Sequence, residues 1–468
     1  MQTVYFFNTL KRKREEFKPL TPGKAAMYTC GPTVYNFAHI GNFRAYMFED
    51  LLRRTLKLCG YEVTQVMNLT DVDDKTIRDS QAAGMSLNDF TAQYKKSFFE
   101  DLKELNIEPA EYYPAATDHI PEMIELVQTL IDKGFGYVAN DGCVYYSINK
   151  FPGYGKLAKI DMENQISGVR IQNDEYEKDS VADFALWKAW TGADGDVWWD
   201  SPWGKGRPGW HIECSAMSMK YLGKTFDIHT GGIDNMFPHH EDEIAQSEAA
   251  NGCAYVNYWL HCAHLIVNGE KMSKSAGNFF TLRQLLEKGY TGRDMRYVLL
   301  SAHYRKKLNF TFEALDSARI TLKRLATLFE RLRDADGKSD GSLAAIVAEA
   351  KEKFTAALAD DLNTSESAAV IFGLQKEANK QLDAGTLSKE DADAVLDCFR
   401  LFDTVYGVFE VDAEDGDDIP AEIVELAEQR KAARAAKNWA EADAIRDKLK
   451  SLGYAVEDAP DGFRITKL

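Results

Sequence analysis

The amino-acid sequence predicts a mixed α/β fold, followed by a helical region and a small C-terminal module. Three observations predict this fold class. A strand, a helix and a second strand follow one another near the N-terminus, the apolar period becomes helical beyond Phe310, and an acidic stretch precedes residues 421–468. With 468 residues, the chain is long enough for two or three domains.

The first part of the chain predicts a parallel sheet. Ala25–Cys30 has the pattern of a strand, Asn42–Cys59 that of an amphipathic helix, and Tyr61–Leu69 that of another strand. Such a βαβ unit implies a right-handed crossover and a Rossmann-like sheet. Ligands bind beyond the carboxyl ends of these strands, where Cys30 and His39 fall.

An insertion at about 115–203 interrupts this predicted sheet. It contains a helical segment at Pro121–Lys133, a hairpin signal around residues 140–142 and a stretch rich in Gly and Trp. The second half of the sheet then resumes, and a catalytic domain over residues 1–310 is expected. Its predicted elements are Trp210–Tyr221, a strand at Thr225–His229, a helix at Pro238–Asn251 and a strand at Tyr258–Ile266.

The C-terminal part predicts a helical bundle and a separate module. Helical periodicity in Ala314–Arg333, Leu343–Leu358 and Glu366–Gln381 predicts a bundle over residues 311–410. The acidic residues within 411–420 predict a linker, which leaves a final module at 421–468.

Composition limits the class of protein. We expect a cytoplasmic protein without a membrane segment, because no apolar run reaches roughly 18 residues and the N-terminus lacks a secretory pattern. Seven scattered cysteines favour reduced thiols or metal ligands over a disulfide framework. A net charge of −17 argues against nonspecific nucleic-acid binding, so a nucleic-acid partner needs local basic patches.

Two short motifs indicate a phosphate-binding site. His39-Ile40-Gly41-Asn42 precedes a predicted helix, where hydrogen-bond donors and the helix dipole favour anions. By itself this motif also fits a simple helix cap. Lys271-Met272-Ser273-Lys274-Ser275 is more specific, because two lysines flank a hydroxyl in a loop bounded by glycines. Together the motifs suggest ATP activation.

These motifs resemble those of the class I aminoacyl-tRNA synthetases, His-x-Gly-His and Lys-Met-Ser-Lys-Ser, with Asn42 in place of the second histidine. The resemblance implies that ATP, with Mg²⁺, is bound by the residues matching these motifs: His39, Gly41, Asn42, Lys271, Ser273 and Lys274. Catalysis would be electrostatic, with Lys271 and Lys274 on one side of the transferring phosphate and His39 and Asn42 on the other.

A third set of residues indicates a metal site. Cys30 follows a strand, Cys214 lies far away in the sequence, and His239 and Glu243 stand four apart on one helix face. Two thiolates with an imidazole and a carboxylate suit Zn²⁺ better than Mg²⁺. Spacing alone does not join the cysteines to the helix pair, and neighbouring His240 is not excluded.

His261-Cys262-Ala263-His264 offers a rival metal-like spacing. In a strand, alternate residues face opposite sides, so these four side chains would not converge on one ion. We expect Cys262 and His264 to be packing residues.

Longer segments narrow the resemblance to the cysteinyl-tRNA synthetase family. They are Cys30–Tyr35, Thr70–Lys75, Gly206–Met217 and Phe237–Glu241. The resemblance implies that Cys30, Cys214, His239 and Glu243 bind one zinc ion, to which the substrate cysteine adds its thiolate. It also implies that Thr70 and Trp210 line the amino-acid pocket, and that Gly232 and Asp234, with His229 nearby, bind adenosine. Because zinc prefers sulfur, we expect no editing domain.

The resemblance further implies that the bundle contacts tRNA(Cys) and that the final module recognises the anticodon. Basic residues in suitable places are Arg305, Lys306, Lys307, Arg430, Lys431, Arg434 and Lys437. Trp439 could stack on a base or seal the small core, and we favour the core interpretation. The expected partners are tRNA(Cys), L-cysteine and ATP, and the expected state is a monomer.

Two alternatives remain. A mycothiol-pathway cysteine ligase would share the catalytic half but lack the RNA-binding end, whereas this chain continues beyond Pro420. A noncatalytic RNA-binding zinc protein would be expected to have lost His39, Lys271 or Lys274, and all three are present. The leading hypothesis is a cysteine-activating tRNA ligase.

Overall fold

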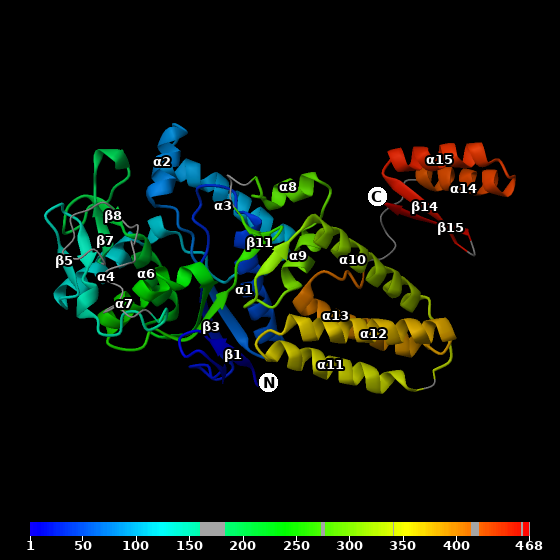
Figure 1. Ribbon diagram of the computed structural model, residues 1–468, viewed down its shortest axis with the longest axis horizontal. Helices are drawn as coiled ribbons and strands as arrows, with labels where there is room; N and C mark the ends of the chain where they lie inside the picture. Colours follow the sequence, from blue (N-terminus) through cyan, green and yellow to red (C-terminus); the bar gives the residue numbers. More distant parts are fainter. Residues whose placement is uncertain (160–182, 273–276, 340, 413–420, 460–461, 468) are drawn as a thin grey trace. The chain divides into compact units, whose positions relative to one another are not determined.

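The computed structural model describes residues 1–159, 183–272, 277–339, 341–412, 421–459 and 462–467. By their internal contacts, these residues form two units, Met1–Phe409 and Glu410–Leu468. Figure 1 shows the order of the elements along the chain.

A four-stranded parallel sheet supports the first unit. Its order is β10 (Val256–Cys262), β9 (Phe226–Gly232), β3 (Lys24–Thr29) and β4 (Glu62–Met67). Helix α1 (Ile40–Leu58) connects β3 to β4, as the predicted βαβ unit requires. Strands β9 and β10 are buried almost throughout, as in parallel sheets covered by helices. The predicted α/β fold class is confirmed.

The predicted single strand Tyr258–Ile266 is wrong. Strand β10 ends at Cys262, and β11 (Leu265–Val267) belongs to a small second sheet with β12 (Glu270–Lys271) and β13 (Leu308–Phe310). Between β10 and β11, the Ala263 N–H donates to the carbonyl of Tyr304 at 2.8 Å. The chain therefore changes partner strands at this point, although its apolar pattern is continuous.

The inserted region builds an antiparallel sheet of its own. The order is β5 (Gly136–Val138), β6 (Val144–Tyr146), β7 (Phe184–Ala189) and β8 (Gly206–Pro208), and β5 and β6 form the predicted hairpin. Helix α4 (Ile120–Asp132) agrees with the predicted helix. One apolar core joins this region to β9 and β10, through residues such as Trp187, Phe226 and Trp259.

Other elements of the first unit surround the sheet. Two helices, α6 (Trp210–Leu222) and α7 (His239–Asn251), pack on each other beside β3 and β9. The remaining elements outside the bundle are β1 (Tyr5–Asn8), β2 (Lys13–Glu16), α2 (Asp74–Ala82), α3 (Leu87–Glu104), η1 (Ala116–His119), η2 (Ile148–Lys150), η3 (Gly192–Asp194), η4 (Ile233–Met236), α8 (Leu282–Glu287) and α9 (Gly292–Leu300).

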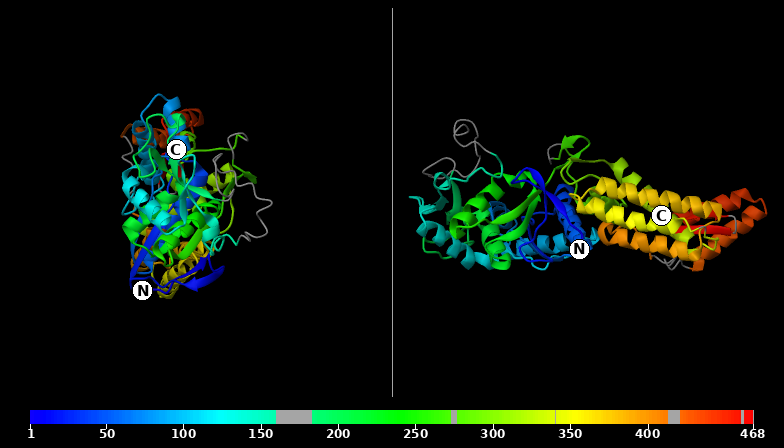
Figure 2. Two further views of the ribbon diagram at one scale, coloured as in Figure 1. Left: turned by 90° about the vertical axis from the view of Figure 1, so that its left-hand side faces the viewer. Right: turned by 90° about the horizontal axis from the view of Figure 1, so that it is seen from below.

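A helical bundle completes the first unit and packs against α1. Its helices are α10 (Phe312–Arg333), α11 (Leu343–Ala359), α12 (Thr364–Ala384) and α13 (Lys389–Tyr406). They run side by side in Figure 1 and in the right-hand view of Figure 2. Buried Arg296 of α9 holds the end of α13, because it donates to the carbonyl of Val405 at 3.0 Å and pairs with Asp50 of α1 at 2.6 Å.

The second unit contains α14 (Ala421–Ala435), α15 (Trp439–Ser451) and a hairpin of β14 (Tyr454–Ala459) with β15 (Gly462–Lys467). Its core includes Ile423, Leu426 and Leu449. Trp439 is 56% exposed, so the core interpretation of this residue is wrong. It is the first residue of α15, where its ring lies outside the helix packing. Most of the predicted linker, residues 413–420, lies outside the described residues.

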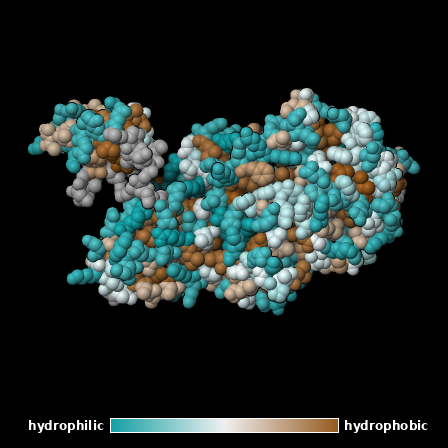
Figure 3. Space-filling view, turned by 180° about the vertical axis from the view of Figure 1, so that it is seen from behind, coloured by the Kyte–Doolittle hydropathy of each residue, from teal (hydrophilic) through white to brown (hydrophobic). Residues whose placement is uncertain are grey.

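Hydrophilic side chains predominate on the face of the first unit seen in Figure 3, with apolar residues in smaller groups between them. Among the helices that the structure describes, none combines the length and the apolar character needed to cross a bilayer.

Candidate active site

The metal-type pocket is built where the central strands end. Cys30 directly follows β3, and the Gly31 N–H donates to Oδ1 of Asn68, just beyond β4, at 2.9 Å. A Cβ on Gly31 would lie 1.7 Å from the Asn68 carbonyl oxygen, so only glycine permits this approach. Thr70 and Thr33 then form a bridge. The two strand ends thereby bring Cys30 and Thr70 to one edge of the sheet.

The four predicted metal ligands are brought together. Ligand atoms of Cys30, Cys214, His239 and Glu243 all lie within 4.8 Å of one another. Helix α6 supplies Cys214, and one turn of α7 supplies His239 and Glu243, whose Nε2 and Oε1 atoms are 3.1 Å apart. Four residues from three segments therefore converge as the resemblance implied.

Two more histidines lie in the same cluster. Cys30, His229, His240 and Glu243 form a second set within the same 4.8 Å limit. The Cys30 sulfur is 3.2 Å from Nε2 of His240, and Oε2 of Glu243 is 2.9 Å from Nε2 of His229. His229, which is predicted to lie near the adenosine-binding residues, is fully buried and contacts Glu243. Sequence spacing alone had not excluded His240 from the ligand set.

The ligand side chains are oriented by neighbours. Nδ1 of His239 shares a hydrogen bond with Nδ1 of His211 at 2.8 Å, which directs Nε2 toward Glu243. The Tyr255 hydroxyl donates to Oε2 of Glu243 at 3.1 Å. Such outer contacts fix the rings and carboxylates of metal sites.

Burial sets the protonation of the cluster. Desolvation lowers the pKa of His239 to about 3, so the imidazole is neutral and able to donate a lone pair. The pKa of Cys30 is raised by its hydrogen bond with Cys214 and by burial. The pKa of Cys214 is also raised, because the hydrogen bond with Cys30 lowers it less than burial and the charge of Glu243 raise it. A cation is the group that would make these buried thiols ionise.

The donor set fits zinc. Two sulfurs, one imidazole nitrogen and one carboxylate oxygen are ligands typical of Zn²⁺, whereas Mg²⁺ prefers oxygen alone. Oε1 of Glu243 is buried without a hydrogen-bond partner among the described residues, although it lies near His239. This orphaned oxygen, aimed at the other three ligands, is the observation that favours a cation there.

The residues predicted to bind the amino acid are linked to the cluster by side-chain contacts. The Thr70 hydroxyl donates to Oε2 of Glu213 at 2.9 Å and accepts from Nδ2 of Asn68 at 3.2 Å. Trp210, at the start of α6, stacks on His239 with 4.2 Å between ring centroids, and it is 42% exposed. Trp210 therefore contacts a residue of the metal-type cluster directly, and Thr70 contacts Glu213, the residue before Cys214.

The nucleotide-type motifs meet at the start of α1. His39 caps this helix: the Asn42 N–H donates to Nδ1 of His39, and the His39 N–H donates to Oδ1 of Asn42, each at 3.1 Å. Since Nδ1 accepts, a neutral ring carries its proton on Nε2. The Ile40 and Asn42 N–H groups already have partners, so it is the positive end of the α1 dipole that favours an anion here.

The lysine-bearing loop lies against this helix start. The Ile40 N–H donates to the Phe280 carbonyl at 2.9 Å, and His39 forms a bridge with Thr281. A Cβ on Gly41 would lie 2.9 Å from Cε of Met272, so the Met272 side chain reaches the first turn of α1. Lys271 is exposed in β12. Ser273 and Lys274 lie outside the described residues.

The predicted adenosine-binding residues lie at the end of β9. Gly232 ends this strand, and Asp234 follows in η4 with an exposed carboxylate. His264 lies 3.9 Å from Oδ1 of Asp234, and its side chain is 48% exposed. The packing interpretation of His264 is therefore wrong, because the break after β10 turns it outward. Cys262 is buried, as expected.

Sequence reasoning missed several buried groups. Glu213 is fully buried beside Cys214, and its Oε1 has no hydrogen-bond partner in the described part of the chain. Glu49 of α1 is also buried, and its Oε1 accepts from the Thr230 hydroxyl at 3.1 Å. Glutamate in an apolar helix stretch was the available signal in both cases.

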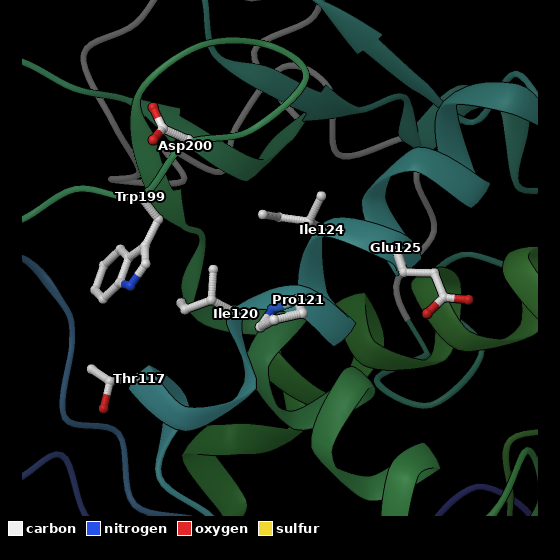
Figure 4. Close-up of a pocket in the computed structure, with 7 residues that line it drawn as sticks. All are labelled: Thr117, Ile120, Pro121, Ile124, Glu125, Trp199 and Asp200. Carbon is white, nitrogen blue, oxygen red and sulfur yellow. The ribbon is translucent and has the colours of Figure 1, made fainter.

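A surface pocket of about 520 Å³ lies apart from the metal-type cluster, in the inserted region. Figure 4 shows the Trp199 indole facing Ile120 and Ile124 of α4 across it. The lining is Thr117, Ile120, Pro121, Ile124, Glu125, Trp199 and Asp200. None of these residues was predicted to act in the site.

Family models match three parts of the chain. The tRNA synthetases class I (C) catalytic domain matches residues 16–320, the DALR domain 353–410, and the Cysteinyl-tRNA ligase anticodon binding domain 416–464. Among solved structures, Mycobacterium tuberculosis methionyl-tRNA synthetase in complex with methionyl-adenylate is similar in fold, with a TM-score of 0.62 and 15% identity over 82% of this chain and 92% of that one. The chain is a class I aminoacyl-tRNA synthetase.

Curated relatives narrow the class. A cysteine-tRNA ligase from Protochlamydia amoebophila (strain UWE25) is 51% identical over 98% of this chain and 97% of that protein. One from Brachyspira hyodysenteriae (strain ATCC 49526 / WA1) is 49% identical over 99% of each. The chain belongs to the cysteine-tRNA ligase family.

Proposed function

We propose that this enzyme activates L-cysteine with ATP and transfers the cysteinyl group to the terminal adenosine of tRNA(Cys). The observation that carries the proposal is the convergence of two buried thiols, His239 and Glu243 within 4.8 Å of one another. A pocket that only measured shape would separate cysteine poorly from serine, which differs from it by one atom. A ligand set that takes a soft cation would separate them by chemistry.

Cys30, Cys214, His239 and Glu243 would hold one zinc ion. When bound, zinc prefers sulfur and lowers the pKa of a thiol, so it supplies selectivity for the side chain of cysteine. His211 and Tyr255 would keep His239 and Glu243 in their ligating orientations through the contacts at 2.8 and 3.1 Å. The protein frame would thus be ready before the substrate arrives.

Thr70, Glu213 and Trp210 would bind the rest of the amino acid. The Thr70 oxygen donates one hydrogen bond and accepts another, which leaves one lone pair for the substrate ammonium group. Oε1 of Glu213, buried and unpartnered in the described residues, is a second acceptor for it. The Trp210 ring beside His239 would exclude water from that side.

On the nucleotide side, the substrate carboxylate would attack the α-phosphorus of ATP, forming a C–O–P linkage as the bond to pyrophosphate breaks. Nε2–H of His39 would donate to a phosphate oxygen, and the positive end of the α1 dipole would stabilise the phosphate charge. Lys271 and Lys274, together with Mg²⁺, would neutralise the charge on the leaving pyrophosphate. Gly232 and Asp234 would face the adenosine, with Asp234 accepting from ribose hydroxyls.

For the transfer step, we propose that the bundle of residues 311–410 contacts tRNA and that residues 421–468 recognise the anticodon. The exposed Trp439 ring has the Arg434 guanidinium 5.6 Å from its centroid, an arrangement suited to stacking an unpaired base. The match at 416–464 favours this tRNA function over an amino-sugar acceptor.

Because every group proposed for activation comes from one chain, we propose that a monomer carries it out. We also propose a cytoplasmic location, where thiols stay reduced; all seven cysteines are unbridged.

The test is ATP–pyrophosphate exchange with cysteine and with serine, before and after zinc removal. The untreated enzyme should prefer cysteine at least about 10⁴-fold, beyond what a shape-based pocket achieves. Chelation should abolish exchange, and added Zn²⁺ should restore it. A metal-free protein that still prefers cysteine would disprove the proposed basis of selection.

A further inference from the structure

The loop that starts at Lys271 is held at both described ends, by β11 on its entry side and by the start of α1 on its exit side. On its entry side, β12 pairs with β11 through Lys271 and Ile266. On its exit side, Phe280 accepts from the Ile40 N–H, and the Phe279 ring packs edge-on against His39 with 5.0 Å between centroids. We call Phe279–Thr281 the exit stem. Its position therefore sets the distance between the two nucleotide motifs.

The exit stem leads directly into α8, and Arg283 in its first turn contacts α3. One terminal nitrogen of Arg283 donates to Oε2 of Glu100 at 2.7 Å and to the Ser97 carbonyl at 3.3 Å. Nε lies 3.3 Å from Oδ1 of Asp101, an ion-pair distance without hydrogen-bond alignment. Asp101 is buried, so this arginine closes over the carboxylate from outside.

The same guanidinium covers an aromatic ring in the segment that precedes His39. Its central carbon is 5.3 Å from the ring centroid of Phe37, which lies two residues before His39. Tyr94 of α3 packs edge-on against Phe37 at 5.5 Å. Arg283 of α8 thus contacts both α3 and Phe37, which lies in the segment leading to His39.

We propose that Arg283 is a positioning residue for the ATP-dependent step, because it fixes the exit stem of the Lys271 loop against α3 and Phe37, and so keeps this stem in register with His39. The inference rests on the ATP role proposed above for the two motifs. A displacement of about 1 Å can reduce the rate of a positioned reaction up to about 10²-fold. Arginine suits the position because its planar fork meets carboxylate, carbonyl and ring together.

The test is Arg283→Met in the full-length, zinc-loaded enzyme, assayed by cysteine-dependent pyrophosphate exchange without tRNA. We expect the KM for ATP to rise about tenfold and the KM for cysteine to stay within about twofold, because only the nucleotide side is displaced. Arg283→Lys keeps the charge but not the fork, and should give an intermediate KM for ATP. Zinc content should not change, and the melting temperature should fall by no more than a few degrees, because Asp101 loses its cation.

Arg319→Met is the matched control. Arg319 of α10 also pairs with a carboxylate, Asp294 at 3.2 Å, and covers a ring, that of Tyr290 at 4.7 Å, but it contacts the chain after α8 and not the segment before it. Its removal should leave both KM values unchanged. Loss of Asp101 by Asp101→Asn should raise the KM for ATP in the wild type and have a smaller effect in the Arg283→Met background.

Two results would overturn the inference: an unchanged KM for ATP in Arg283→Met, or equal rises in both KM values with loss of zinc, which would indicate a general structural role. Lys271→Ala separates this failure from that of the ATP assignment. If Lys271→Ala abolishes exchange while Arg283→Met has a normal KM for ATP, only the positioning role is wrong. If Lys271→Ala exchanges normally, the ATP assignment itself is wrong.

Discussion

The metal-type pocket and the nucleotide side lie at one edge of the same sheet, yet they are built differently. The pocket consists of buried side chains: Cys214, His239 and Glu243 are each at most 2% exposed. The nucleotide side consists of a helix start and a loop stem, with Lys271 exposed. A site that must distinguish single atoms needs rigid, dry ligands, whereas a site that admits and releases a large anion needs backbone donors within reach of solvent.

The largest expected effect comes from a substitution in the buried, metal-type site. Cys214→Ser replaces a soft thiolate with a hydroxyl, a poor zinc ligand, so zinc should be lost and cysteine exchange should fall more than about 10³-fold. Zinc per folded chain and exchange rate are the measurements. Cys398→Ser is the control, since Cys398 is fully buried in α13. Retained zinc with normal exchange in Cys214→Ser would remove this residue from the ligand set.

The next effect separates activation from recognition of the acceptor. A chain ending at Phe409 keeps the first unit complete, so its exchange should match the wild type, while the kcat/KM for charging tRNA(Cys) should fall about 10²-fold. Trp439→Ala should cost about tenfold in charging, because stacking contributes about 1–3 kcal/mol per base. Trp190, 43% exposed in the first unit, supplies the control Trp190→Ala. Full charging by the shortened chain would refute anticodon recognition by residues 421–468.

The sequence predicts the local elements of the site better than it predicts how these elements come together. The βαβ unit and the adjacent helix pair, His239 with Glu243, follow from local periodicity. Their union with Cys30 and Cys214 depends on strand order and on the packing of α6, which spacing does not encode; the resemblance to a family supplied it. The contact of His229 with Glu243 does not follow from the sequence for the same reason, because the two residues are adjacent in space only.

Errors at other residues have local causes. The strand breaks after Cys262, where the Ala263 N–H bonds to the carbonyl of Tyr304, more than 40 residues away in the sequence. The apolar run around Cys262 does not indicate this break, so the sequence predicts that His264 packs inside. Trp439 was expected in a core because an isolated tryptophan in a small module usually packs there. Its place at the first turn of α15 leaves it at the surface.

The smallest expected effect concerns Asn42, the residue that departs from the family motif. Its carboxamide accepts from the His39 N–H, while its own backbone N–H holds Nδ1 of His39. Asn42→Ala removes only the first bond, so the His39 tautomer is kept. We expect a loss of about 1 kcal/mol in unfolding free energy and a KM for ATP raised no more than about threefold.

A matched capping box exists far from the nucleotide side. Asp391 closes the box with Ser388 at the start of α13, so Asp391→Ala should cost similar stability with no change in the KM for ATP. Denaturant unfolding and pyrophosphate exchange measure the two quantities. A rise of tenfold or more in the KM for ATP in Asn42→Ala would mean that the side chain itself contacts the nucleotide. The nucleotide side would then bind its ligand through a specific side chain, as the metal-type site does. The difference in construction between the two sites would be smaller than the geometry indicates.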